Sequence, residues 1–403
     1  MSANLKPAGF PEVARDVCPA CGHAMHTFFR LPAVPVNSCI LVDSREEALA
    51  FPRGDIELGV CPGCGFICNQ AFDPKRTEYS GRYEETQAYS PTFNKFHSAL
   101  ARDLVERFGL QGKTVVEVGC GKGEFLGLLC RLGGNAAIGY DPGYDPQREI
   151  FDAGTPARMI RDFYGPGSGT GEGDLVCCKM TLEHIRGTHD FALTLRDAMK
   201  PDGTSSVFIQ VPESLRILRD VAFEDIYYEH CSYFTPGSLA RLFRKAGYRV
   251  DRLDVTYAGQ YLTLEGGLAD GRDAPPLPLE ESVQSVVELA QSFNRRFEGR
   301  RAEWRALIED AARRGPVAVW GSGSKAVAFL RATDPASQLI EHVVDINPHR
   351  QGHFMPGTGQ RILSPDDLRT VAPAAVIVMN PIYREEIAAE LARQGVAAAL
   401  YAL

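Results

Sequence analysis

The stretch "TVVEVGCGKGEFLGLLC", residues 114–130, is the part of the sequence that decides the fold. It begins with an apolar run typical of a buried strand and ends with a run typical of a helix. Between the two runs, Gly119, Gly121 and Gly123 provide a tight turn, because glycine adopts backbone conformations that other residues avoid. A strand, a glycine turn and a helix in this order predict the first unit of a parallel α/β sheet.

Acidic residues follow the next strands of this predicted sheet. "AAIGYDPG" places Asp141 at the end of the second strand, where an acid can accept both hydroxyls of a ribose. "MIRDFY" places Asp162 after a third strand, within reach of an adenine amino group. "GDLVCCKMTLEHI" supplies a fourth strand, with Glu183 and His184 beyond its carboxyl end. These acids predict a nucleoside-containing cofactor at this edge of the sheet.

The spacing of the glycines distinguishes between cofactors. The order from Glu117 is E-x-G-x-G-x-G, which differs from the G-x-G-x-x-G order of dinucleotide-binding folds. We therefore count Glu117, with the three glycines and both aspartates, among the candidate cofactor-binding residues. An NAD-binding Rossmann domain and a related fold without any cofactor remain as alternatives.

Composition sets the class of protein. A chain of 403 residues with 44% hydrophobic and 23% charged residues predicts two or three globular domains. A formal net charge of -8 argues against general binding to nucleic acids or anionic membranes. No apolar run is long enough to span a bilayer, and "MSANLKPAGF" does not resemble a signal peptide. We therefore expect a cytoplasmic protein with reduced cysteines.

The chain divides into four stretches. Two CxxC pairs mark the first, strand–helix alternation marks the second, and the Gly/Pro-rich "GGLADGRDAPPLPL" with a long charged helix marks the third. "GPVAVWGSGSKAVAFL" then opens a second glycine-turn α/β unit, with further strands at "HVVDI" and "AAVIVMN". The predicted boundaries are 1–75, 76–268, 269–314 and 315–403, with the long helix at about 279–314.

The first stretch predicts a zinc site. Two C-x2-C pairs, each followed by a glycine, have the look of zinc-ribbon knuckles, in which four thiolates bind one ion tetrahedrally. Four protein ligands leave no open position, so the zinc is expected to be structural. Unligated thiols and redox chemistry are the alternatives. The expected ligands are Cys18, Cys21, Cys61 and Cys64.

"YYEHCSYFTP", residues 227–236, carries many proton-handling side chains where a helix is about to begin. Thr235 and Pro236 predict the helix start. The segment follows the fifth predicted strand, "SSVFIQVPES", and so crosses the carboxyl edge of the sheet, where α/β folds bind ligands. His230 is suited to remove a proton at neutral pH. Alternatively, it is a structural residue that caps the helix.

These features together resemble the sugar C-methyltransferases. Residues 95–265 resemble a class I methyltransferase that uses S-adenosylmethionine. The zinc module, the Y-x-E-H motif before "YFT", the C-terminal glycine-turn unit, and "PVN" at 35–37 extend the resemblance over nearly the whole chain. It implies an α/β fold of three parts and substrates that are nucleotide-linked 4-ketohexoses, usually dTDP-sugars.

The resemblance also implies roles for single residues. The histidine of the motif, His230, removes the proton at C3 beside the C4 ketone, with Tyr227 and Glu229 as its partners. A histidine after the fourth strand corresponds to His184. A tyrosine before the core also enters the site, and of the three candidates, Tyr79, Tyr83 and Tyr89, we favour Tyr83.

For the cofactor, the resemblance implies that the glycine turn passes under the methionine part of S-adenosylmethionine and that Asp141 holds its ribose. The C-terminal unit helps to enclose the nucleotide-sugar. In this unit, Lys325 and the backbone amides of the turn could bind a pyrophosphate. Alternatively, the unit only forms part of the wall of the cleft.

We therefore expect an S-adenosylmethionine-dependent C-methyltransferase acting on a nucleotide-linked ketosugar. The first alternative is an O- or N-methyltransferase on another natural-product scaffold, with His230 deprotonating a hydroxyl. The second is a zinc-ribbon sensor that binds the cofactor without catalysis. The expected partners are small molecules, with no nucleic acid and no membrane. The sequence leaves the oligomeric state open, and a monomer is compatible with it.

Overall fold

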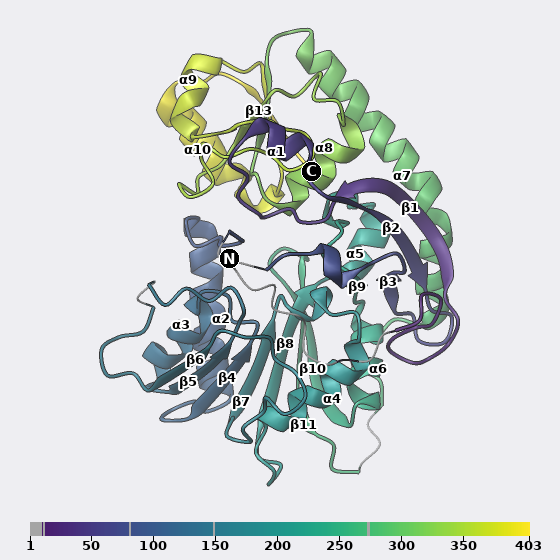
Figure 1. Ribbon diagram of the computed structural model, residues 1–403, viewed down its shortest axis with the longest axis vertical. Helices are drawn as coiled ribbons and strands as arrows, with labels where there is room; N and C mark the ends of the chain where they lie inside the picture. The colour runs from purple at the N-terminus through teal and green to yellow at the C-terminus, as the bar shows by residue number, and fades with distance from the viewer. Residues whose placement is uncertain (1–9, 11–12, 80–81, 148–149, 272–274) are drawn as a thin grey trace.

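The computed structural model describes residues 10, 13–79, 82–147, 150–271 and 275–403. The predicted absence of a signal peptide concerns residues that lie almost wholly outside these ranges. The described chain forms three sheets, with the core sheet and the C-terminal sheet at opposite ends of the molecule (Figure 1). No helix in the described part of the chain is both long and apolar enough to cross a membrane.

The core is a seven-stranded mixed sheet in the order β10-β11-β8-β7-β4-β5-β6. The neighbours from β8 to β6 are parallel, whereas β11 runs antiparallel to both β8 and β10. The chain order reverses beside β4, so the carboxyl ends of β4 and β7 form the place where such sheets bind ligands. Its strands are β4 (Thr114–Val118), β5 (Ala136–Tyr140), β6 (Ala157–Ile160), β7 (Leu175–Lys179), β8 (Ser206–Pro212), β10 (Tyr248–Thr256) and β11 (Tyr261–Leu268).

Five α-helices belong to this core. The predicted strand, turn and helix at 114–130 are confirmed, since β4 leads through the glycines into α3. Thr235 and Pro236 begin α6, as predicted. The helices are α2 (Pro91–Arg107), α3 (Glu124–Gly133), α4 (Thr188–Leu195), α5 (Ser214–Asp220) and α6 (Pro236–Lys245).

The N-terminal sheet takes a strand from the core. It is antiparallel, in the order β1-β2-β3-β9, with β1 (His26–Pro35), β2 (Arg53–Val60), β3 (Ile67–Asn69) and β9 (Ser232–Tyr233). Ile67 pairs with Tyr233, and the backbone N–H of Asn69 donates to the carbonyl of Cys231 over 2.9 Å. The segment that carries His230 is thus joined to the N-terminal sheet, which the predicted boundary at residue 75 does not capture.

The C-terminal sheet is parallel throughout, in the order β14-β13-β12-β15-β16. Its strands are β12 (Val317–Trp320), β13 (His342–Val344), β14 (Ile362–Leu363), β15 (Ala375–Val378) and β16 (Ala399–Ala402). Its helices are α8 (Ser324–Thr333), α9 (Leu368–Val371) and α10 (Arg384–Gln394). The short helix α1 (Arg45–Leu49) of the N-terminal part lies against this unit, because the Gly357 N–H donates to the Ala48 carbonyl over 2.8 Å (Figure 1).

The long predicted helix is α7 (Val283–Ala312), which begins where the Ser282 side chain accepts a hydrogen bond from the Ser285 N–H. It packs on β1, since the Phe29 ring meets those of Phe293 and Phe297 at centroid distances of 5.3 and 5.0 Å. In Figure 1, α7 lies beside β1 and β2 and runs up to the C-terminal unit. It therefore braces the N-terminal sheet against the rest of the molecule.

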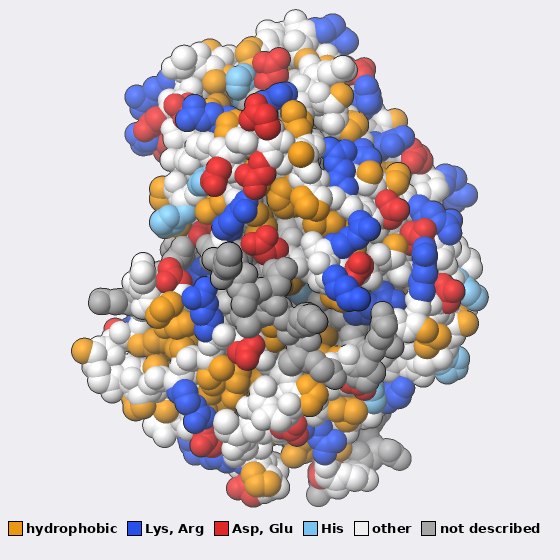
Figure 2. Space-filling view, viewed as in Figure 1, with side chains coloured by type: hydrophobic (Ala, Val, Ile, Leu, Met, Phe, Trp, Pro, Cys, Tyr) orange, Lys and Arg blue, Asp and Glu red, His pale blue; other side chains and the backbone are white. Residues whose placement is uncertain are grey.

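Charges are mixed on the face shown in Figure 2. Lysine and arginine side chains alternate there with aspartate and glutamate, in keeping with the net charge of -8. The described surface on this face therefore shows no extended basic field of the kind that binds nucleic acid.

Candidate active site

A cavity of about 1590 Å³ lies at the carboxyl edge of the core sheet. Its wall includes Cys39 from the N-terminal part, Asp141 and His230 from the core, and Lys325 from the C-terminal unit. Single small-molecule sites usually occupy roughly 300–1,000 Å³. The cavity therefore has room for two small ligands, and all three parts of the chain close around it.

The glycine turn forms one wall of this cavity. Gly119, Gly121 and Gly123 have φ values of 73°, 55° and 88°, in the left-handed region that favours glycine. A Cβ atom on Gly119 would lie 1.9 Å from the Thr181 hydroxyl, because the loop after β7 packs directly onto the turn. Glycine at position 119 therefore allows the glycine turn and the loop after β7 to pack directly against each other.

Asp141 stands beside this turn, as predicted. Its carboxylate accepts the N–H of Gly121 over 2.9 Å and that of Gly143 over 2.7 Å. Burial raises its pKa, and these two backbone hydrogen bonds oppose that effect. A carboxylate has about four acceptor sites, so two remain for a ligand's hydroxyl groups.

Two further acids predicted for the cofactor also line the cavity. Glu117 is buried in β4, and burial raises its pKa to about 7. Within the described residues its Oε2 atom has no hydrogen-bond partner. Asp162 is exposed just beyond β6 and accepts the Phe163 N–H over 2.8 Å. Open acceptors at the glycine turn fit the ribose hydroxyls and amino groups of S-adenosylmethionine.

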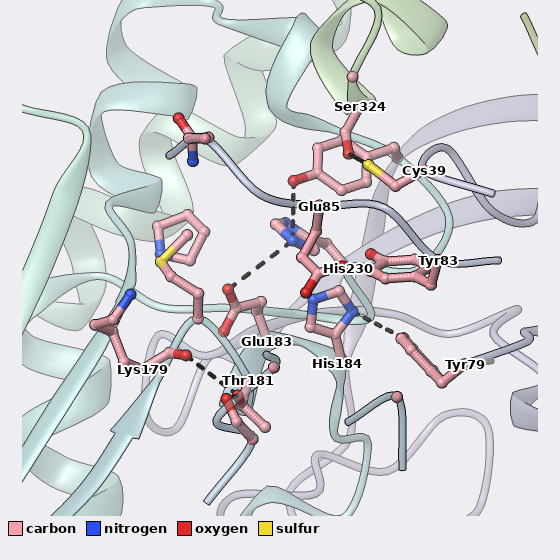
Figure 3. A pocket seen from close by; sticks show the side chains of 18 of the residues that line it. Cys39, Tyr79, Tyr83, Glu85, Lys179, Thr181, Glu183, His184, His230 and Ser324 are labelled. Carbon is pink, nitrogen blue, oxygen red and sulfur yellow. Dashed lines mark hydrogen bonds and ion pairs between the residues drawn. The ribbon is translucent and has the colours of Figure 1, made fainter. Parts of the chain in front are cut away.

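His230 lies in a cluster of aromatic and acidic groups (Figure 3). Its Nε2 atom is 2.9 Å from the Tyr227 hydroxyl and 3.9 Å from Oε1 of Glu183. Its ring meets that of His184 edge to face, with 4.8 Å between the centroids. Burial lowers the pKa of His230 well below its usual range, helped by His184 and Lys325. The imidazole is therefore uncharged at neutral pH.

The alternative role for His230, as a helix cap, is wrong. Helix α6 is capped by Thr235, whose side chain accepts the Ser238 N–H over 3.3 Å while the Ser238 hydroxyl accepts the Thr235 N–H over 2.9 Å. Glu281 adds a third contact by accepting the Gly237 N–H over 2.9 Å. The helix start is complete without the histidine.

His184 and two of the three candidate tyrosines meet in the same cluster. His184 Nδ1 lies 2.9 Å from the Tyr79 hydroxyl and 3.0 Å from the Glu229 carbonyl oxygen. Burial lowers the pKa of His184 to about 4. Tyr83 donates to Oε1 of Glu229 over 3.3 Å, whereas Tyr89 is 41% exposed. Of the three candidate tyrosines, Tyr79 and the favoured Tyr83 both contact this cluster.

The Glu229 carboxylate makes its hydrogen bonds away from His230, although the resemblance implies that Glu229 is a partner of this histidine. Its carboxylate accepts the Ser38 N–H over 2.8 Å, together with the hydroxyls of Ser38 and Tyr83. Burial raises its pKa to about 7, against the lowering effect of these hydrogen bonds. The Glu229 side chain points to the loop after "PVN" because Ser38 supplies hydrogen-bond donors there. Tyr227 is the motif residue that contacts His230.

Two contact residues were missed by the sequence analysis. Ser38 follows "PVN" and joins Glu229 to the C-terminal unit, because its hydroxyl also donates to that of Ser324 over 2.6 Å. Glu183 was placed at the sheet edge but given no role, and its Oε1 atom lies 3.9 Å from His230 Nε2. Its position directly before His184, on the loop after β7, was the signal that could have found it.

Lys325 points from the start of α8 to the core. Its ammonium group pairs with Asp225, which also pairs with Arg216. Lys325, Arg216 and the turn residues Gly323 and Ser324 all line the cavity. The C-terminal unit therefore places a cation and a helix N-terminus at the cavity wall.

The predicted zinc ligands come together. The sulfurs of Cys18, Cys21, Cys61 and Cys64 all lie within 4.8 Å of one another. The Cys18–Cys64 and Cys21–Cys61 pairs are 3.7 and 3.4 Å apart. Four thiolates around one zinc lie about 3.8 Å apart, given a Zn–S distance of about 2.3 Å. The set thus fits a tetrahedral zinc site.

Both knuckles have the same turn. The N–H of Gly22 donates to the Cys18 carbonyl over 2.8 Å, and that of Gly65 to the Cys61 carbonyl over 2.9 Å. These glycines have φ values of 87° and 74°, which confirms the predicted turning of the backbone. The knuckle geometry is therefore present in the protein's own fold.

Two family models match the chain. One describes a methyltransferase domain and matches residues 93–253, and the other describes a C-methyltransferase C-terminal domain and matches residues 280–399. Among known proteins, the C-methyltransferase NovU of Streptomyces niveus is 30% identical over 395 residues, which cover 92% of this chain and 91% of NovU.

Two of the similar solved structures are methyltransferases with low sequence identity to this chain. A 1,6-didemethyltoxoflavin-N1-methyltransferase from Burkholderia thailandensis has a TM-score of 0.36 and 17% identity, over 44% of this chain and 80% of its own. A methyltransferase from Aquifex aeolicus has a TM-score of 0.35 and 17% identity, over 49% and 100%. The match to NovU and the two family models show that the chain belongs to the sugar C-methyltransferases, S-adenosylmethionine-dependent enzymes with a class I methyltransferase core.

Proposed function

We propose that this enzyme methylates the carbon next to the ketone of a nucleotide-linked 4-keto deoxysugar, with dTDP as the nucleotide. The observation that carries the proposal is His230, an uncharged imidazole at the cavity wall. Carbon becomes nucleophilic only after a base removes its proton, whereas oxygen and nitrogen already have lone pairs. A base held inside the site therefore favours carbon as the methyl acceptor.

In the proposed reaction, His230 takes the proton from the carbon next to the ketone. The C–H bond breaks, its electron pair enters the enolate, and negative charge gathers on the former ketone oxygen. When bound, S-adenosylmethionine supplies an electrophilic methyl group on its sulfonium sulfur. That electron pair would form the new C–C bond to this methyl group as its bond to sulfur breaks, with the bonding pair left on sulfur, and His230 would release its proton to water.

We assign the ketone oxygen to the Tyr79 hydroxyl. The Glu229 carbonyl 3.0 Å from His184 Nδ1 can only accept, so this nitrogen carries the imidazole proton. The Tyr79 hydroxyl, 2.9 Å from the same nitrogen, then keeps its own proton available. Tyr83 instead donates to the Glu229 carboxylate and so supports the segment that carries His230.

The cofactor is assigned to the glycine turn and the acids beside it. The two open acceptor sites of Asp141 suit the ribose hydroxyls, and Asp162 suits the adenine amino group. The unpartnered Oε2 of Glu117 suits an ammonium group of the methionine part. These assignments place the methyl donor along β4, on the side of the cavity formed by the core.

The nucleotide diphosphate is assigned to the C-terminal unit. Helix α8 presents its N-terminal amides at the cavity, where anions are favoured, and Lys325 adds a positive charge. Lys325 pairs with Asp225 and would exchange this partner for a phosphate oxygen. The competing role, in which this unit only walls the cleft, predicts no effect of Lys325 on substrate affinity.

We further propose that the four cysteines hold one structural zinc ion. Metal analysis of the purified enzyme should give about one zinc per chain, and Cys61→Ser should unfold the N-terminal module because metal binding supplies its folding energy. Activity should fall with it, since β3 follows the second knuckle and pairs with β9 beside His230. A metal-free, folded and active preparation would contradict this proposal.

Solvent deuterium exchange tests the proposed reaction. A dTDP-linked 4-keto-6-deoxyhexose incubated with enzyme and S-adenosylhomocysteine in D₂O should gain deuterium at the carbon next to the ketone. Mass spectrometry of the sugar measures this gain, and the heat-inactivated enzyme is the control. Methyl transfer without any exchange at carbon would instead favour the O- or N-methyltransferase.

A further inference from the structure

His230 alone is a weak base in this structure. Burial lowers its pKa well below the usual range, with smaller contributions from His184 and Lys325. The neutral ring is available to take a proton, but the same burial disfavours the imidazolium that results. A negative charge beside the ring would stabilise that imidazolium and so make proton removal from carbon easier.

Glu183 is the acid in position to supply this charge. Its Oε1 lies 3.9 Å from His230 Nε2, and both side chains are buried, with exposures of 1% and 5% (Figure 3). Neither carboxylate oxygen of Glu183 has a hydrogen-bond partner within the described chain. Buried polar groups are nearly always hydrogen-bonded, so an unpartnered carboxyl at a cavity wall indicates a functional position.

The loop that carries Glu183 is held firmly in place. Met180 has a φ of 53°, a conformation that costs energy for a residue with a long side chain and persists only when its surroundings hold it. Its N–H donates to the Gln210 carbonyl over 2.7 Å, and the Thr181 hydroxyl donates to the Gly119 carbonyl over 3.3 Å. Glu183 is thus fixed relative to the glycine turn and to β8.

We propose that Glu183 is the positioning residue that makes His230 an effective base. The Tyr227 hydroxyl, 2.9 Å from Nε2, accepts the hydrogen bond of an Nε2–H, and the negative charge of Glu183 at 3.9 Å favours the proton on this nitrogen, so that Nδ1 keeps the lone pair. When Nδ1 takes the substrate proton, the carboxylate stabilises the imidazolium, as the carboxylate of a serine-protease triad does. This inference rests on the proposed role of His230 as the base.

The proposal predicts a dependence on pH. Burial raises the pKa of Glu183 to about 8, so the carboxyl group ionises as the pH rises through this value. The active pair, an ionised Glu183 and a neutral His230, becomes neutral overall when it gains the substrate proton. Below pH 8 a proton on Glu183 removes the charge, so proton removal should become faster with rising pH and level off above about 8.

Other groups around Glu183 also influence its charge. Lys179 at the end of β7 favours the ionised form. Glu183 also interacts electrostatically with Cys178 of its own strand, Tyr227 of the motif, Tyr79 of the N-terminal part and Tyr261 of β11. The two histidines lie close to it, with ligand atoms of Glu183, His184 and His230 within 4.8 Å of one another. Of all these, His230 is the group whose protonation the reaction changes.

Exchange measured against pH tests the pair. In the D₂O experiment, the wild-type exchange rate should rise about tenfold per pH unit below pH 8 and then level off. Glu183→Gln keeps the size of the side chain and removes the charge, so the rate at pH 8.5 should fall about 10- to 100-fold and lose this rise. Glu265→Gln is the matched control, because Glu265 is buried in β11, pairs with Arg107 and does not line the cavity. It should keep the wild-type profile.

Nitrogen NMR of histidine-labelled enzyme with S-adenosylhomocysteine gives a second readout without any sugar. At pH 9 the wild-type His230 ring should carry its proton on Nε2, and Glu183→Gln should shift it toward Nδ1. An unchanged tautomer together with an unchanged pH profile overturns the inference. If wild-type enzyme never exchanges the sugar proton, the proposed function fails, and the tautomer alone decides whether Glu183 and His230 form a pair.

A bound cation is the competing explanation for this cluster. Ligand atoms of Glu183, His184 and His230 all lie within 4.8 Å of one another. A metal ion there would occupy the lone pair that the base needs. Metal analysis that finds two ions per chain in the wild type and one in Glu183→Gln overturns the proposed pair, whereas equal metal content in both supports it.

Discussion

The core and the C-terminal unit share one backbone arrangement, a glycine-containing turn beside an aspartate, and differ in the side chains that contact this aspartate. In the core, β4 leads into a glycine turn and Asp141 follows β5, and in the C-terminal unit β12 leads into "GSGS" and Asp345 follows β13. Each aspartate accepts one N–H from the turn and one from the residue two positions further along, Gly143 in the core and Asn347 in the C-terminal unit. The backbone pattern is therefore the same in both.

The side chains beside the two aspartates differ. Asp141 takes two backbone donors, which leaves room for the hydroxyls of a ligand. Asp345 also accepts the Ser322 hydroxyl over 2.6 Å and lies 3.8 Å from the buried guanidinium of Arg350. In the C-terminal unit, the acceptor sites of the aspartate are therefore taken up by side chains of the same unit. A glycine turn with an aspartate creates an anion-and-hydroxyl site, but the neighbouring side chains decide whether a ligand can use it.

The largest expected effect tests whether the chemistry belongs to the core unit. His230→Ala should lower kcat by about 10²–10⁴-fold, the usual contribution of a general base. It should leave the affinity for S-adenosylmethionine within about twofold, because the glycine turn and Asp141 are untouched. Deuterium exchange on the sugar should be lost as well. Exchange at the wild-type rate in this variant would move the base to another residue, with His184 the first to test.

The second test concerns Asp141, the aspartate of the core whose remaining acceptor sites are available to a ligand. Asp141→Ala removes the proposed ribose acceptor and should weaken S-adenosylmethionine binding by about 10- to 100-fold, since a hydrogen bond with a charged partner contributes about 1.5–3 kcal/mol. Calorimetry measures the affinity. Binding as tight as in the wild type would show that the acid is not a ligand and would remove the difference between the two units.

The third test asks what the C-terminal unit contributes. Lys325→Met should raise the KM for the nucleotide-sugar about tenfold, with kcat within about twofold, because it removes a charged contact present throughout the reaction. Steady-state kinetics with the sugar varied separates the two parameters. An unchanged KM would indicate that this unit only walls the cleft.

The smallest expected effect on cofactor binding is that of replacing Asp345, whose carboxylate already contacts other side chains of the C-terminal unit. Asp345→Asn should leave the affinity for S-adenosylmethionine unchanged, because Ser322 and Arg350 already occupy this carboxylate. It should lower the unfolding midpoint, since Arg350 loses the charge of a buried partner. Calorimetric titration and thermal unfolding of the same sample measure both. A loss of cofactor affinity here would mean that the two units are not distinct.

Local features of this protein were readable from the sequence. The strand and turn at 114–123 were predicted because glycine positions and apolar runs determine backbone conformation over a few residues. The same holds for Thr235, which caps α6, and for the glycines after each cysteine pair, whose positive φ values follow from the turn itself. Asp141 was placed correctly because its position follows from a strand end.

Contacts between distant segments were not readable in this way. Glu229 was expected beside His230, but its carboxylate bonds Ser38, 191 positions away in the chain. Glu183, on a different loop, has its carboxylate 3.9 Å from His230 Nε2, and no periodicity in either segment indicates that they meet. The strand β9 likewise joins the N-terminal sheet across a predicted domain boundary.

The sequence by itself determined the two glycine-turn units, the cysteine knuckles and the segment that carries His230, because each depends on residues within a few positions or on one strand end. Only the tertiary structure decided that the Asp345 carboxylate contacts Ser322 and Arg350. It also decided that the Glu183 carboxylate lies 3.9 Å from the His230 ring. Such pairings depend on which way side chains turn once separate segments pack. That choice is made by the available donors, acceptors and space at the meeting point and not by the local pattern of either segment.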